Sequence, residues 1–233
     1  MPAIVLVHGI GVSHRYLART HNVLRERAPA DRVAVLSVDL PGCGGLPKPR
    51  TDADVPRMAA ALGAALDRCG VGGAVLVGHS MGAQWVTELA RQRPGLARAV
   101  VLIGPVADDR HRTASAQARA LVVDTLREAP GTNMVVFTDY LRCGVPWYLR
   151  QLRHMLAYPL EERARELTQP VLVVRGARDP IAGEGWCRRI AAAAPRGAFS
   201  VVSGGAHVIQ DAQPGALATA LLACLSEVEF SSF

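Results

Sequence analysis

Lysine is almost missing from this chain: Lys48 stands alone against 25 arginines in 233 residues. The formal charge of +6 would suit a polyanionic partner. Nucleic-acid binding, however, needs cations gathered on one surface, and here the arginines are scattered along the sequence. Ala, Gly and Arg are all abundant, so a GC-rich genome explains the charge more simply. We expect no nucleic-acid partner.

Paired cysteines and long apolar runs are also missing. The cysteines form no C-x-x-C pair and have no metal-ligand spacing, so we interpret them as free thiols and expect no metal or other cofactor. They are Cys43, Cys69, Cys143, Cys187 and Cys224. The first apolar run, Ala3 to Val7, is too short for a signal peptide or a membrane span, and no basic segment precedes it. The sequence therefore predicts a cytoplasmic protein without a membrane partner.

Short runs rich in Val, Ile and Leu alternate with helical patterns at His14–Arg27, Val55–Arg68 and Ala83–Arg93. Such runs suit strands that are buried on both faces of a parallel sheet. The alternation predicts an α/β fold, with a doubly wound, mostly parallel sheet of about six strands. The runs are Ala3–Val7, Val33–Val38, Ala74–Val77, Ala99–Ile103, Val171–Val174 and Phe199–Val202.

The alternation breaks after Ile103, and residues 105–169 contain helical patterns without a convincing strand. Leu121, Val122, Thr125 and Leu126 mark one amphipathic helix in this segment. We predict an inserted helical cap at 105–169, carried by an α/β core of residues 1–104 and 170–233. The cap should supply the walls of a substrate pocket.

The segment Gly78-His79-Ser80-Met81-Gly82 follows one apolar run and opens a helical stretch. A serine with glycines two residues before and two residues after it, in a strand–turn–helix setting, indicates a nucleophile elbow. A serine hydroxyl is a poor nucleophile by itself, so it needs a base and usually a carboxylate that orients the base.

His207 is the best candidate for the base because it lies in a small-residue loop directly after the last predicted strand. Asp179, in a turn after the strand Val171–Val174, is the candidate acid, with Asp108 and Asp109 as backups. An isolated aspartate before a proline is more often an ordinary turn residue. The chain order Ser, Asp, His after three different strands favours the catalytic interpretation.

Acyl transfer also needs hydrogen-bond donors for the developing oxyanion. The main-chain N–H of Met81 is one donor by construction, and the loop His8-Gly9-Ile10-Gly11 after the first strand predicts the N–H of Ile10 as the second.

These motifs together resemble the α/β-hydrolase superfamily, and most closely its lid-bearing group of serine esterases, lactonases and carbon–carbon hydrolases. The resemblance covers nearly the whole chain, includes Asp39-Leu40-Pro41-Gly42 after the second strand, and implies that Asp39 shapes a loop. The two antiparallel strands that usually open the family's sheet are absent. Their absence predicts an exposed sheet edge that a second copy could cover in a homodimer. A monomeric mass by light scattering across a concentration series would contradict that dimer.

The expected activity is hydrolysis of a carboxylic ester, lactone or thioester of a small molecule through an acyl-enzyme. A carbon–carbon hydrolase is one alternative, although Val208 stands where such enzymes often carry Trp. A repurposed, non-hydrolytic member that acts as a cyclase or a small-molecule binding protein is another. The serine argues against the relatives that use an aspartate nucleophile.

Gly11, Trp147 and Tyr148 are the predicted substrate-binding residues, and Phe137, Tyr140 and Met155 are further candidates for the pocket wall. Aromatic and Met residues at helical spacing are also typical of simple core. Arg142, Arg150 and Arg153 either bind a substrate carboxylate or form a solvated helix face.

Overall fold

The computed structural model describes the main chain of residues 3–28, 33–108 and 112–230, and side chains within those ranges up to residue 223. Six parallel strands form one sheet in the order β2-β1-β3-β4-β5-β6, which confirms the predicted fold class. Within the described ranges, no antiparallel strand precedes or joins it. The strands are β1 Ala3–Val7, β2 Ala34–Val38, β3 Ala74–His79, β4 Ala97–Ile103, β5 Val171–Gly176 and β6 Gly197–Val202.

The central strands are mainly apolar because each contributes side chains to two hydrophobic cores, one on either face of the sheet. In β1, Val5 and Val7 belong to the cluster on one face of the sheet, whereas Ile4 and Leu6 belong to the cluster on the other. Successive side chains of a strand point to opposite faces, so a strand that is covered on both sides buries mainly apolar side chains in both directions.

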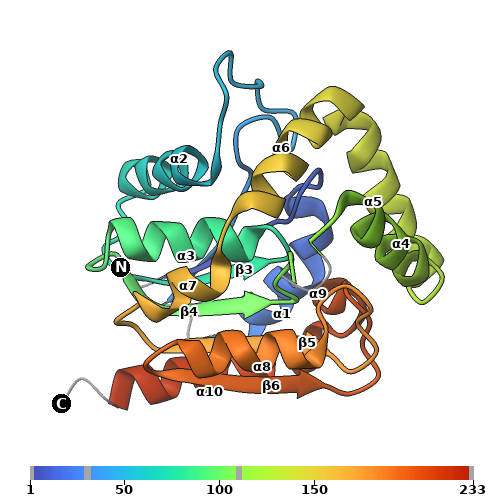
Figure 1. The fold of residues 1–233 in the computed structure, drawn as a ribbon. Coiled ribbons are helices and arrows are strands. Elements are labelled where there is room, and N and C mark those ends of the chain that lie inside the picture. The colour runs from blue at the N-terminus through green and yellow to red at the C-terminus, as the bar shows by residue number, and fades with distance from the viewer. Residues whose placement is uncertain (1–2, 29–32, 109–111, 231–233) are drawn as a thin grey trace.

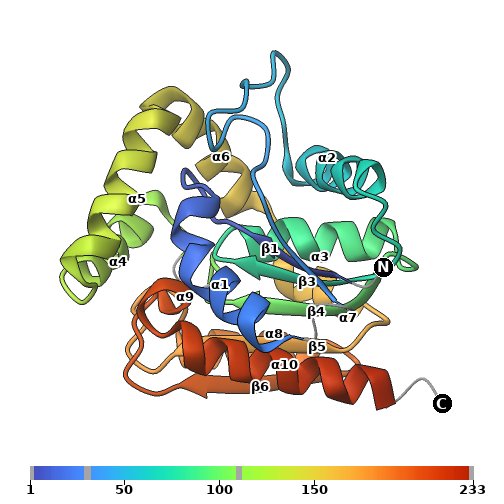
Figure 2. The same ribbon diagram turned by 180° about the vertical axis from the view of Figure 1, so that it is seen from behind.

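Helices cover both faces of the sheet. One face carries α2 (Val55–Arg68), α3 (Gly82–Gln92), α7 (Leu160–Arg165) and α8 (Glu184–Ala193), as Figure 1 shows. The other face carries α1 (Ala18–Arg27) and α10 (Pro214–Phe230), which pack against each other (Figure 2). A short 3-10 turn, η1 (His14–Leu17), precedes α1, so the predicted helix His14–Arg27 begins with a tighter turn.

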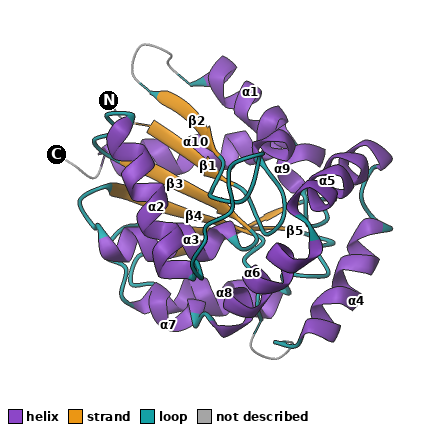
Figure 3. Ribbon diagram, turned by 90° about the horizontal axis from the view of Figure 1, so that it is seen from above, coloured by secondary structure: helices purple, strands orange, loops and turns teal. Residues whose placement is uncertain are grey.

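Three helices lie together at the carboxyl edge of the sheet: α4 (Ala114–Thr125), α5 (Pro130–Cys143) and α6 (Val145–Ala157) (Figures 1 and 3). The fourth helix between β4 and β5, α7, instead packs against α3 and α8 in the layer that covers the sheet. The predicted apolar stripe on α4 divides. Leu121 and Thr125 line a cavity, whereas Val122 and Leu126 are 62% and 83% exposed. Neighbouring residues on a helix are turned about 100° apart, so only one pair can face inward.

Four cysteines, Cys43, Cys69, Cys143 and Cys187, are free thiols, and the side chain of Cys224 lies outside the described residues. No helix in the described part of the chain is both long and apolar enough to cross a membrane.

Candidate active site

Ser80 lies at the end of β3 in a strained turn. Its φ of 57° is in the left-handed region, where residues other than glycine are uncommon. Gly78 and Gly82 permit the turn by close packing. A Cβ on Gly78 would collide with the main chain of Gly82, and a Cβ on Gly82 would collide with the carbonyl oxygens of Val7 and His8. The two glycines therefore allow β3, α3 and the loop after β1 to meet at the serine.

His207 and Asp179 form a buried hydrogen-bonded pair. The Nδ1 atom of His207 lies 2.9 Å from Oδ2 of Asp179. Two main-chain donors hold the other carboxylate oxygen: the N–H groups of Ile181 and Ala182 donate to Oδ1 at 2.8 and 2.9 Å. Although burial opposes it, the charge of His207 and these hydrogen bonds lower the pKa of Asp179. The carboxylate is thus an ionised acceptor, which places the proton of the imidazole on Nδ1 and leaves Nε2 available as a base.

Electrostatics favour the charged form of this imidazole. Burial lowers the pKa of His207, but the charge of Asp179 and its hydrogen bond outweigh burial and raise that pKa above its ordinary value. An imidazolium at this position is therefore strongly stabilised.

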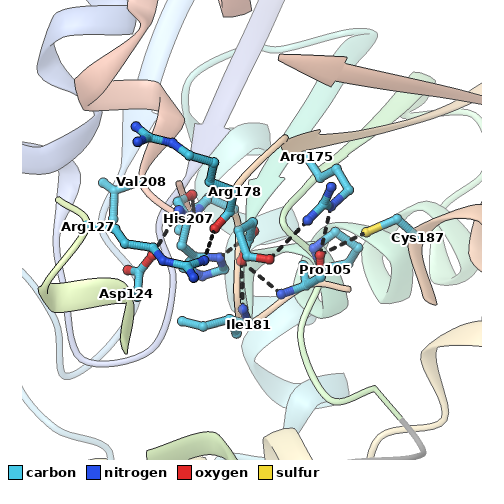
Figure 4. Close-up of polar contacts among 12 residues, drawn as sticks. Pro105, Asp124, Arg127, Arg175, Arg178, Ile181, Cys187, His207 and Val208 are labelled. Atoms are coloured by element: carbon cyan, nitrogen blue, oxygen red, sulfur yellow. Dashed lines mark hydrogen bonds and ion pairs between the residues drawn. The ribbon is translucent and has the colours of Figure 1, made fainter. Parts of the chain in front are cut away.

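Arg175, which the sequence did not single out, holds the loop of Asp179. Its buried guanidinium donates to the carbonyl oxygens of Ala182 at 2.9 Å and Asp179 at 3.0 Å (Figure 4). Gly104 makes room for the pair from the other side. A Cβ on Gly104 would lie 3.0 Å from Nδ1 of His207 and 3.1 Å from Oδ2 of Asp179.

The loop after β1 approaches the serine closely, since a Cβ on Gly9 would lie 3.0 Å from Cβ of Ser80. The side chain of His8 holds this loop through two hydrogen bonds. Its Nε2 accepts a hydrogen bond from the N–H of Leu40 at 3.1 Å, so its Nδ1–H donates to the carbonyl of Gly9 at 2.7 Å. In the described part of the chain, the main-chain N–H groups of Ile10 and Met81 donate to no protein acceptor. Both therefore remain available to a ligand beside Ser80.

A buried chain of hydrogen bonds joins this loop to the loop of His207. The N–H of Gly9 donates to the hydroxyl of Tyr16 at 2.6 Å, and that hydroxyl lies 2.7 Å from Nδ1 of His79. Nε2 of His79 lies 3.0 Å from the carbonyl oxygen of His207. A carbonyl can only accept, so Nε2 carries the proton and the Tyr16 hydroxyl donates to Nδ1. Burial and the charge of His207 lower the pKa of His79 well below its ordinary value, which keeps it neutral.

Two carboxylates from the segment between β4 and β5 also bind the His207 loop, and neither was singled out from the sequence. Oδ1 of Asp124, in α4, accepts the N–H of His207 at 3.0 Å (Figure 4). Oε1 of Glu128 accepts the N–H of Val208 at 2.7 Å. Of the two backup acids, Asp108 pairs with Arg189 at 3.3 Å, and Asp109 lies outside the described residues.

Ser80 and His207 line one cavity of about 510 Å³ between the sheet edge and the helices α4, α5 and α6. In the part of the chain that the structure describes, the Ser80 hydroxyl forms no hydrogen bond; such contacts are often loose before a substrate binds. The walls are largely aliphatic and aromatic, and no lysine or arginine of the described ranges lines them. The apolar walls include Val12, Val106, Leu121, Val136, Leu152, Met155 and Ile181.

The predicted substrate-binding residues separate in the structure. Tyr148 lines the cavity with Tyr140 and Met155, whereas Gly11 lines a second, smaller cavity. Trp147 is buried outside both, with its indole ring against Gly42. Phe137 is 59% exposed.

The three arginines proposed for a substrate carboxylate are engaged elsewhere. Arg153 pairs with Asp52 at 2.7 Å, and the guanidinium of Arg150 lies 5.7 Å from the ring centre of Trp147. Arg142 lies 3.7 Å from a carboxylate oxygen of Asp139.

A six-stranded parallel sheet with a serine elbow and a His–Asp pair at its carboxyl edge is the architecture of the α/β hydrolases. The chain belongs to the alpha/beta hydrolase family, whose sequence model matches residues 4–220.

Solved structures of the same fold include an esterase from Thermogutta terrifontis, which is 22% identical with a TM-score of 0.80 over 98% of this chain and 90% of that one. The enol-lactonase from Burkholderia xenovorans LB400 is 19% identical with a TM-score of 0.80, over 97% of this chain and 91% of that one. The meta-cleavage product hydrolase from Pseudomonas fluorescens IP01 is 16% identical with a TM-score of 0.75, over 97% and 91%. At these identities the likeness shows the fold.

Among curated sequences, an uncharacterized protein of Mycobacterium tuberculosis (strain ATCC 25618 / H37Rv) is 33% identical over 102 residues. The match covers 44% of this chain and 28% of the relative, so the shared segment is less than a third of the curated relative's length.

Proposed function

We propose that the protein is a serine hydrolase that cleaves a carboxylic ester, lactone or thioester of a small, uncharged molecule. One observation carries the proposal: His207, which is hydrogen-bonded to Asp179, lines the same cavity as the elbow residue Ser80. The esterase and enol-lactonase that share the fold are consistent with it.

In the proposed reaction, Oγ of Ser80 attacks the acyl carbonyl while Nε2 of His207 takes its proton. Asp179 holds the proton on Nδ1 and stabilises the imidazolium that forms. The N–H groups of Ile10 and Met81 receive the oxyanion. His207 then protonates the leaving group and activates a water molecule, which releases the acid from Ser80.

The cavity wall supports an apolar, uncharged acyl group. Its lining is mainly aliphatic and aromatic, so an alkyl or aryl chain would be desolvated there at little cost. A carboxylate on the substrate would meet no lysine or arginine among the described lining residues. The same observation weighs against a carbon–carbon hydrolase acting on a dienol acid, although a meta-cleavage product hydrolase shares the fold.

The test is a panel of p-nitrophenyl esters, lactones and acyl thioesters, run with wild-type protein, Ser80→Ala and a matched control, Ser37→Ala in β2. We expect Ser80→Ala to lose on the order of 10⁶-fold in kcat, as removal of a triad nucleophile does, and Ser37→Ala to stay near wild type.

A Ser80→Ala protein that keeps more than a tenth of the activity would refute the assignment. Turnover of a ring-cleavage product without any ester hydrolysis would favour the carbon–carbon hydrolase. A failure of Ser80 to react with a fluorophosphonate probe would favour a non-hydrolytic member.

A further inference from the structure

The main chain on both sides of the His207 side chain is held from the segment that carries the cap. Asp124 accepts the N–H of His207, and Glu128 accepts the N–H of Val208. Asp124 is in α4 and Glu128 lies just beyond it, and these contacts span 83 and 80 positions of the chain. The position of the base therefore depends on the position of α4.

A charged group is a costly way to accept a single main-chain hydrogen bond. Asp124 is 3% exposed, and burial raises the pKa of its carboxyl group above the ordinary value. It also lies in the last turn of α4, where the helix dipole disfavours an anion. A neutral asparagine carbonyl could accept the same N–H. A carboxylate that breaks these local rules at a cavity wall points to a role for its charge.

The charges around His207 are mostly negative. Asp179 faces the imidazole from the loop after β5, Asp124 and Glu128 face it from the cap side, and His79 lies beneath it as a neutral ring. Arg127 is a nearby cation, and its guanidinium donates to the carbonyl of Arg178 at 2.7 Å (Figure 4).

Asp124 differs from Glu128 and Asp179 in one respect that matters for substrates. Asp124 lines the cavity, and the other two carboxylates do not. A substrate anion in the cavity would lie within several ångströms of this carboxylate, with no lining lysine or arginine of the described ranges to compensate. At an effective dielectric constant of about 20, that repulsion disfavours an anion by about tenfold or more.

We propose that Asp124 is a positioning and specificity residue: its carboxylate anchors the main chain of His207 and keeps anionic molecules out of the cavity. The inference rests on the proposed ester hydrolysis and adds a reason for the charge. The substrate of that reaction is neutral, and the acid released is an anion. The carboxylate of Asp124 therefore favours entry of the ester and expels the product.

The decisive variant is Asp124→Asn, which keeps the acceptor and the size but removes the charge. Glu128→Gln is the matched control, because it makes the same change on the neighbouring hydrogen bond outside the cavity lining. The substrates are p-nitrophenyl hexanoate and the p-nitrophenyl half-ester of adipic acid, whose chains are equally long and differ in the terminal carboxylate.

We expect Asp124→Asn to raise kcat/KM for the anionic half-ester relative to the neutral ester by about tenfold or more. The acid limb of its pH–rate profile should move to lower pH, because a nearby negative charge that stabilises the imidazolium is gone. Glu128→Gln should leave the substrate ratio unchanged. An Asp124→Asn ratio within twofold of wild type would overturn the proposal, because a merely structural role would leave the ratio where it was.

Measurements of ligand binding test the role of Asp124 independently of the proposed hydrolase activity. Calorimetric titration with hexanoate and hexanamide needs no turnover, and we expect Asp124→Asn to tighten binding of hexanoate relative to hexanamide by about tenfold. A wild-type protein that hydrolyses nothing in the panel of esters, lactones and thioesters refutes the proposed function, whereas the calorimetric ratio still decides the role of Asp124. An unchanged calorimetric ratio overturns that role whatever the protein hydrolyses.

Discussion

His79 donates a hydrogen bond from Nε2 to the main-chain carbonyl of His207, at 3.0 Å and across 128 positions of the chain. The residue beside the elbow serine thus supports the loop of the proposed base. Through Tyr16 the same ring reaches the N–H of Gly9, next to the proposed oxyanion donor Ile10. Three loops of the site are therefore tied together by neutral groups.

Replacing Tyr16 with Phe should break this chain of hydrogen bonds at its middle. The N–H of Gly9 and Nδ1 of His79 would both lose a buried partner, which costs about 1–3 kcal/mol of stability. We expect kcat to fall about tenfold or more, because the loops that carry the proposed base and oxyanion donor lose this support. Tyr158→Phe is the control, since it loses a buried hydrogen bond to Glu88 outside the cavity lining. Equal kcat values for the two variants would contradict a role of this hydrogen-bond chain in catalysis.

Gly104→Ala should separate the His–Asp pair. The new Cβ would lie 3.0 Å from the His207 ring and 3.1 Å from the Asp179 carboxylate, so the pair must shift. A misplacement of about 1 Å costs roughly 100-fold in rate, and because these contacts require a smaller shift we expect a smaller but clear loss in kcat. Gly70→Ala controls for backbone strain, since Gly70 also has a positive φ, of 66°, and a Cβ there meets nothing within 4 Å. If Gly104→Ala kept wild-type kcat, the packing argument would fail.

Stability should decrease as the pH falls below 6.5, in part because of His8. Burial lowers the pKa of His8 from its ordinary value of 6.5. The unfolded chain then binds a proton that the folded protein does not. The contribution of neutral His8 to the free energy of unfolding is fully present above pH 6.5. It is lost as the pH falls toward the folded-state pKa, by up to about 1.4 kcal/mol per pH unit. In urea denaturation at pH 7.5, 6.5 and 5.5, the free energy of unfolding should decrease less with falling pH for His8→Gln than for wild type. The same dependence of unfolding free energy on pH in both proteins would contradict this role of His8.

Exchanging Arg142, Arg150 or Arg153 for Gln should not change the preference between acidic and neutral esters. None of the three lines the cavity, and each guanidinium is held by a partner elsewhere. Steady-state kinetics with hexanoate and adipate half-esters provides the measurement. A selective rise in KM for the acidic ester in any variant would place that arginine on the substrate path.

Much of the site could be predicted because its residues are tied to strand ends. Ser80, Asp179 and His207 each follow an apolar run, and parallel strands present their carboxyl ends at one edge of the sheet. The pattern therefore indicated their neighbourhood without any knowledge of distances. The same reasoning could not place Trp147, which has the composition of a pocket residue but packs against Gly42 outside the cavity.

The residues that support the site carry no local signal. Asp124 and Glu128 lie in an ordinary helical pattern, Tyr16 lies in a short turn, and Gly104 follows a strand as many glycines do. Each acquires its role from a contact with a segment that is distant in the sequence. Asp124 and His207, for example, are 83 positions apart.

By itself, the sequence determined the alternation of buried strands and amphipathic helices and the order of serine, aspartate and histidine along the sheet edge, because hydrophobic periodicity and strand–turn motifs are local. Only the tertiary structure decided which side chains hold the proposed base, which residues of α4, α5 and α6 line the cavity and which charged group lies in the cavity wall. Hydrogen bonding and burial between distant segments depend on how the helices pack, and that packing is not a property of any short stretch of residues.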